Sequence, residues 1–81
     1  MEDREFYDRL SALERALSGG REDPLPSRDE LGRVRAALLA LGRDPSTGGD
    51  RERVAALDAV YAVLGRVTGM VEDEEAEAAR Q

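Results

Sequence analysis

The sequence predicts an all-α protein: a three-helix antiparallel bundle, or a helical hairpin with an N-terminal helix, completed by homodimerisation through the third helix. Three observations predict this class. Apolar residues recur at helical spacing in three segments, glycines and prolines separate these segments, and no stretch shows the alternation of a half-buried strand. We therefore expect a single helical domain over residues 1–71. Residues 72–81 form an acidic C-terminal tail that is either a helical extension or disordered.

The first helix is expected from about Asp3 to Ser18. Its apolar residues have spacings of four, three and four, which place them on one helix face. They are Phe6, Leu10, Leu13 and Leu17. Gly19 and Gly20 are candidate C-caps, and Pro24 in the linker that follows prevents the helix from continuing.

The second helix has the clearest start signal. Ser27 and Glu30 fit a capping box, in which the Ser27 hydroxyl accepts from the Glu30 amide and the Glu30 carboxylate reaches back. An apolar stripe follows, and Gly42 ends it. The stripe consists of Leu31, Val34, Leu38 and Leu41. The loop over residues 43–49 is short, so the second and third helices are expected to pack antiparallel.

The third helix begins near Asp50, its expected N-cap, and runs at least to Val71. Its apolar residues cover about 200° of the helix, roughly twice the arc of an ordinary surface helix. We expect the two shorter helices to cover only part of this arc, and a second copy of the chain, in a dimer or a higher oligomer, to cover the rest. The alternative is a monomeric three-helix bundle in which the third helix is the most buried member. The expected interface residues are Val60, Val63, Leu64, Val67, Met70 and Val71. The expected intrachain core is Phe6, Leu10, Leu13, Leu31, Val34, Leu38, Leu41, Leu57 and Tyr61.

Four further residues of this helix allow two interpretations each. Gly65 and Gly69 form a small-x-x-x-small pair, as in membrane helices, but Asp58 and Arg66 lie in the same stretch and are costly inside a bilayer. We therefore expect no membrane span, and we interpret the glycines as positions where another helix approaches closely or that simply face water. Asp58 and Arg66 are either solvent-exposed or a pair that sets the register with a partner helix.

The composition excludes several classes of site. The chain has no Cys, His or Trp, which excludes a disulfide scaffold, a Cys/His zinc site, a haem centre and a Ser-His or Cys-His catalytic pair. The acidic run over residues 72–77 lacks the glycine-containing loop of a calcium site. Because so short a chain can hardly enclose a pocket, we expect no enzyme activity, no cofactor and no metal.

The charged residues also limit the classes of partner that we expect for the chain. The chain has 18 acidic and 12 basic residues, a net charge of -6, and every basic residue is arginine. The absence of Lys, Ile and Asn favours a gene from a high-GC bacterium over selection of arginine for anion contacts, and salt adaptation is a third explanation. The acidic first residues are unlike a signal peptide, so we expect a cytoplasmic protein.

Nucleic-acid binding is not favoured, because acidic residues are interleaved with the arginine patches and phosphate binding needs uncompensated positive charge. The patches consist of Arg28, Arg33, Arg35, Arg43, Arg51 and Arg53. The sequence instead favours a non-catalytic, self-associating interaction protein, an adaptor, regulatory or assembly subunit with a larger protein as a further partner. Two alternatives stay open: a nucleic-acid-associated accessory protein of phage or plasmid type, and an inert auxiliary subunit of a larger enzyme.

Overall fold

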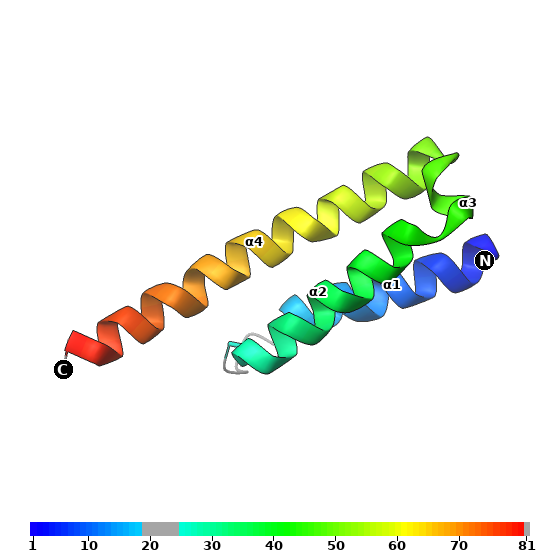
Figure 1. Cartoon of the computed structure of the whole chain (residues 1–81). Coiled ribbons are helices and arrows are strands. Elements are labelled where there is room, and N and C mark those ends of the chain that lie inside the picture. The colour runs from blue at the N-terminus through cyan, green and yellow to red at the C-terminus, as the bar shows by residue number, and fades with distance from the viewer. Residues whose placement is uncertain (19–24, 81) are drawn as a thin grey trace.

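The computed structural model describes residues 1–18 and 25–80, and confirms the all-α class for this part of the chain, which contains no strand. The four helices are α1 (Asp3–Ser18), α2 (Arg28–Arg43), α3 (Pro45–Gly48) and α4 (Arg51–Arg80). Figure 1 shows α1 and α4 running in one direction and α2 in the other. Each of these three long helices contacts the other two. The expected C-caps Gly19 and Gly20, and Pro24, lie outside the described residues.

The hydrophobic core lies between the three long helices and contains residues from each. Its members are Phe6, Leu10, Leu17, Leu31, Val34, Leu38, Leu41, Leu57, Val60, Leu64, Val67 and Val71. The stripe expected on α2 is buried in full. Leu13 and Tyr61, which we expected in the core, are partly buried and pack against it.

Side-chain caps fix the beginnings of α2 and α4. The Ser27 hydroxyl accepts from the Glu30 amide at 3.2 Å. Among the hydrogen bonds of the described residues, none runs from the Ser27 amide back to the Glu30 carboxylate, so the box is formed in one direction. At α4, Asp50 Oδ1 accepts from the amides of Glu52 at 2.9 Å and Arg53 at 3.3 Å. Each cap pairs amides that the first turn of a helix leaves without a backbone partner.

The segment expected as a plain loop, 43–49, contains the one-turn helix α3. Asp44 caps this turn, because its Oδ1 accepts from the Ser46 amide at 2.9 Å, and Pro45 suits the first helical position. The buried Thr47 hydroxyl donates to the Leu41 carbonyl at 2.8 Å, which ties the turn to the end of α2. The connection between α2 and α4 is therefore a specific structure and not a simple spacer.

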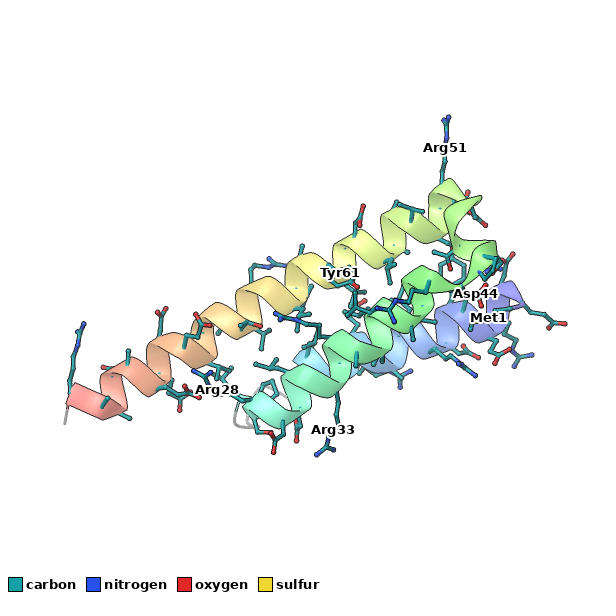
Figure 2. All side chains as sticks on the ribbon, in the orientation of Figure 1. Met1, Arg28, Arg33, Asp44, Arg51 and Tyr61 are labelled. Carbon is teal, nitrogen blue, oxygen red and sulfur yellow. The ribbon has the colours of Figure 1, made fainter. Side chains whose placement is uncertain are left out.

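The acidic tail is helical as far as Arg80, and the last turns of α4 extend past the ends of α1 and α2 (Figure 1). One ion pair attaches this part to the rest of the chain. Arg28 Nε donates to both carboxylate oxygens of Glu75 at 2.9 Å, and Nη2 donates to Oε2 at 2.5 Å. Figure 2 shows Arg28 reaching from the first turn of α2 towards α4. This two-point contact opposes the fraying that negative charge at a helix C-terminus favours.

Candidate interaction surface

The residues expected at a partner interface fall into two groups. Four of them lie in the core of the chain itself, covered by α1 and α2. These four are Val60, Leu64, Val67 and Val71. Val63 is partly buried against the same core, whereas Met70 is 54% exposed. α1 and α2 therefore cover these four side chains within the chain itself, and Met70 is the expected interface residue that is exposed.

The side of α4 that faces away from the core carries a different set of residues, which we call the outward face. It consists of Val54, Ala55, Asp58, Ala59, Ala62, Gly65, Arg66, Gly69 and Met70. All of these are exposed except Gly69, which is partly buried. Val54 and Met70 are two of the four large hydrophobic residues that are exposed in the described part of the chain. The outward face is thus built of small and apolar residues around two opposite charges.

Packing inside the chain does not account for the two glycines of the outward face. A methyl group at Gly65 or Gly69 would meet no side chain and no other part of the fold within 4 Å. Gly42 is different, because a methyl group there would lie 3.3 Å from Leu57 Cδ2, where α2 approaches α4. Glycine inside a helix costs about 1 kcal/mol relative to alanine. Intrachain packing accounts for Gly42 but leaves this cost at positions 65 and 69 without compensation.

A second notable site is the buried Arg53, which is 5% exposed. Its Nε donates to Asp3 Oδ1 at 3.1 Å, and its Nη2 contacts the same oxygen. Nη1 donates to Ser46 Oγ at 2.7 Å, and Nη2 donates to the Met1 carbonyl at 3.0 Å. The guanidinium also lies 5.0 Å from the centre of the Phe6 ring, within cation–π range.

These contacts make Arg53 a junction between the start of α1, the turn α3 and the first turn of α4. The hydrogen bonds to Asp3 are the main reason that the pKa of Arg53 is raised. No buried side-chain nitrogen or oxygen among the described residues lacks a hydrogen-bond partner. Because each guanidinium nitrogen donates a hydrogen bond inside the chain, we assign Arg53 a structural role. The burial of Arg53 corrects its assignment to an arginine patch.

Two carboxylates have a lowered pKa in the folded chain. Hydrogen bonds from the Ser46 hydroxyl and amide lower the pKa of Asp44, and the hydrogen bonds from Arg28 lower the pKa of Glu75. A group whose pKa falls on folding stabilises the fold above its unfolded pKa, about 3.9 for Asp and 4.3 for Glu. This stabilisation is lost as the pH falls through the folded pKa.

We therefore expect the free energy of unfolding to fall below about pH 4 partly through Asp44 and Glu75. Urea unfolding followed from neutral to acidic pH measures this loss. The variant Asp44→Asn/Glu75→Gln should begin less stable at neutral pH and lose less stability in acid than the unchanged chain. An identical acid dependence for both proteins would show that these two contacts do not contribute.

The residues that the structure describes include no group of three or more carboxylates positioned to hold a metal ion. One open groove between α2 and α4 is lined by Arg28, Leu31, Gly32, Arg35, Thr68, Val71 and Glu72. The one hydroxyl in its lining, that of Thr68, donates to the Leu64 carbonyl at 2.7 Å and not to a carboxylate of the groove.

Within the described ranges, α4 is the one helix long and apolar enough to cross a membrane by length and composition. A core helix of a soluble protein meets the same criterion. α4 buries one side against α1 and α2, and its outward face carries Asp58 and Arg66. Charged side chains such as these are costly inside a bilayer.

Comparison of the chain with protein-family models, curated proteins and solved structures finds no match. The candidate site is therefore chosen from the residues and their contacts alone. Arg53 is fully engaged within the chain. The outward face of α4 is exposed except at Gly69, and its residue types point to contact with another helix.

Proposed function

We propose that the protein is a non-catalytic helical interaction subunit that self-associates through the outward face of α4. In this proposal α1, α2 and α4 form a bundle, and a second copy completes it. The observation that carries the proposal is the combination of exposed Val54 and Met70 with two glycines that the chain does not need for its own packing. Exposed apolar and small residues that follow one helix face are typical of an interaction site.

The residue sizes favour a helix as the contacting element. Small side chains at Ala55, Ala59, Ala62, Gly65 and Gly69 leave the backbone of α4 accessible along several turns. Two helices can approach closely where such residues line the contact. The cost of two glycines is then offset by dispersion contacts with the second helix, which larger residues would prevent.

The contacts of the arginines give less support to nucleic-acid binding. Arg28 is paired with Glu75, and Arg53 is buried with Asp3 beside it. Two arginines of the expected patches therefore have carboxylate partners inside the chain, which reduces the positive charge available for phosphates.

The glycines provide the test of this function. In the dilute single chain, Gly65→Ala/Gly69→Ala should raise the free energy of unfolding by about 1 kcal/mol per site, because alanine favours the helix and meets no obstacle. In concentrated solution the same variant should associate more weakly, because two methyl groups push the partner helix away. Thermal unfolding at low concentration and sedimentation equilibrium at high concentration measure the two effects.

Gly32→Ala is the matched control. Gly32 lies in the interior of α2, is exposed, and a methyl group there also meets nothing within 4 Å. We expect this variant to gain helix stability and to associate like the unchanged chain. If the double variant on α4 gains stability and its self-association is unaltered, the outward face is not the contact surface.

A further inference from the structure

We infer that the partner of the outward face is α4 of a second copy, antiparallel to the first, with the two-fold axis beside Ala62. This inference rests on the proposed function and adds the orientation and register of the contact. Ala62 is exposed and lies at the middle of the outward face. In an antiparallel pair centred there, each residue faces the residue that is equally far from Ala62 on the other side.

The two charges of the outward face are complementary in this register. Asp58 and Arg66 each lie four residues from Ala62, and both are exposed. Asp58 therefore faces Arg66 of the partner subunit, and the two-fold axis produces this pair twice. In a parallel pair in register, each charge would instead face its own copy, so two aspartates and two arginines would be opposed. Charge complementarity therefore favours the antiparallel orientation.

A second charge pair requires the same register. Arg51 and Asp73 each lie eleven residues from Ala62, are exposed and continue the outward face at its two ends. Figure 2 shows Arg51 pointing away from the body of the molecule, free of α1 and α2. A register that pairs Asp73 with Arg66 of the partner subunit leaves Arg51 and Asp58 unmatched. The register centred on Ala62 matches all four charges.

The side-chain sizes agree with this register. Val54 and Met70 each lie eight residues from Ala62, about 80° to either side of it, so these exposed large residues flank the contact at its two ends. Ala55 faces Gly69 of the partner subunit and Ala59 faces Gly65 of the partner subunit, seven and three residues from the centre. Small residues meet small residues in the middle, where the two backbones are closest.

Charge reversal tests the pairs. Asp58→Arg places a second arginine opposite Arg66 of the partner subunit, and Arg66→Asp opposes two carboxylates; each should weaken self-association about tenfold or more. The combined variant Asp58→Arg/Arg66→Asp should recover the original association constant, and an equimolar mixture of the two single variants should form heterodimers. Arg33→Asp is the control for added negative charge, because Arg33 is an exposed residue of α2. This variant should associate like the unchanged chain.

Introduced cysteines test the orientation, since the chain has none of its own. Ala62→Cys should oxidise to a covalent dimer, because its two copies meet at the axis. Two copies of Ala55→Cys would lie about 21 Å apart along the helices, beyond the Cα distance that a disulfide spans, so this variant should not cross-link with itself. A mixture of Arg51→Cys with Asp73→Cys, which leaves both glycines in place, should cross-link between the two variants.

The outcomes separate this inference from the proposed function. If the unchanged chain associates but Ala55→Cys cross-links with itself as readily as Ala62→Cys, the antiparallel register is wrong and the interaction surface stands. The same conclusion follows if the combined charge reversal associates no better than either single reversal. If the unchanged chain stays monomeric at all micromolar concentrations, both the register and the self-association are overturned.

Discussion

Phe6→Ala should leave most of the chain unfolded at room temperature. Phe6 is fully buried, its ring is packed edge-to-face against Tyr7 with the ring centres 5.2 Å apart, and the guanidinium of Arg53 lies over it. Replacing a core phenylalanine by alanine costs about 3–5 kcal/mol. A core near this length, without disulfides or metal, supplies only about 3–5 kcal/mol in total. The loss is therefore about as large as the whole free energy of unfolding.

Far-ultraviolet circular dichroism and urea unfolding measure this effect. Phe6→Leu keeps most of the apolar volume and should remain folded with a lower urea midpoint. Leu39→Ala, at a position that is 44% exposed, should unfold almost like the unchanged chain. A helical signal and a cooperative transition in Phe6→Ala equal to those of the unchanged chain would contradict the assignment of Phe6 to the centre of the core.

The second large effect is expected at Arg53. Arg53→Met keeps much of the side-chain length but leaves Asp3, Ser46 and the Met1 carbonyl without their shared donor. Arg53 itself is buried, whereas Asp3 is mostly exposed, so the loss comes from the charge-assisted hydrogen bonds and from the contact of the guanidinium with Phe6. We expect a clear fall in the urea midpoint. Arg53→Lys should recover little, because an ammonium cannot present the planar fork that reaches three acceptors.

Arg33→Met is the control for Arg53, since Arg33 is exposed on α2. The comparison is made by urea unfolding at low concentration, so that self-association does not contribute. Equal urea midpoints for Arg53→Met and Arg33→Met would mean that the junction between α1, α3 and α4 does not stabilise the fold.

The helices could be predicted from the sequence because their signals are local. The Ser27 cap and the α2 stripe from Leu31 to Leu41 depend on residues within a few turns of each other. Helical periodicity places such residues on one face whatever the rest of the chain does. The one-turn helix α3 differs from the loop predicted over residues 43–49, because its start depends on a single aspartate, Asp44, and on Pro45 at its first position.

Arg53 was misplaced because its burial depends on distant parts of the chain. Asp3 lies fifty residues away, and the arrival of α1 beside α4 supplies the carboxylate. A signal was nevertheless present in the sequence. Arg53 precedes Leu57 and Val60 by four and seven residues, so it continues the buried stripe of α4 by one turn towards the N-terminus. An arginine in line with an apolar stripe indicates a side chain that is buried with the stripe.

The division of α4 into a covered and an outward side could not be predicted from the sequence either. Periodicity shows that the apolar arc is wide, but the share of it that α1 and α2 cover depends on how the helices pack. Val67 proved buried at 8% exposure while Met70 is 54% exposed, although both belong to the same predicted arc. The small residues opposite the core, which carried little weight in that prediction, form the surface proposed for association.

Sedimentation equilibrium of the unchanged chain at micromolar concentrations tests the proposed self-association most directly. The antiparallel pair predicts a mass that rises with concentration from 8.8 kDa to twice that value and stops there. A mass that stays at 8.8 kDa across the whole range would contradict a contact between two copies of α4.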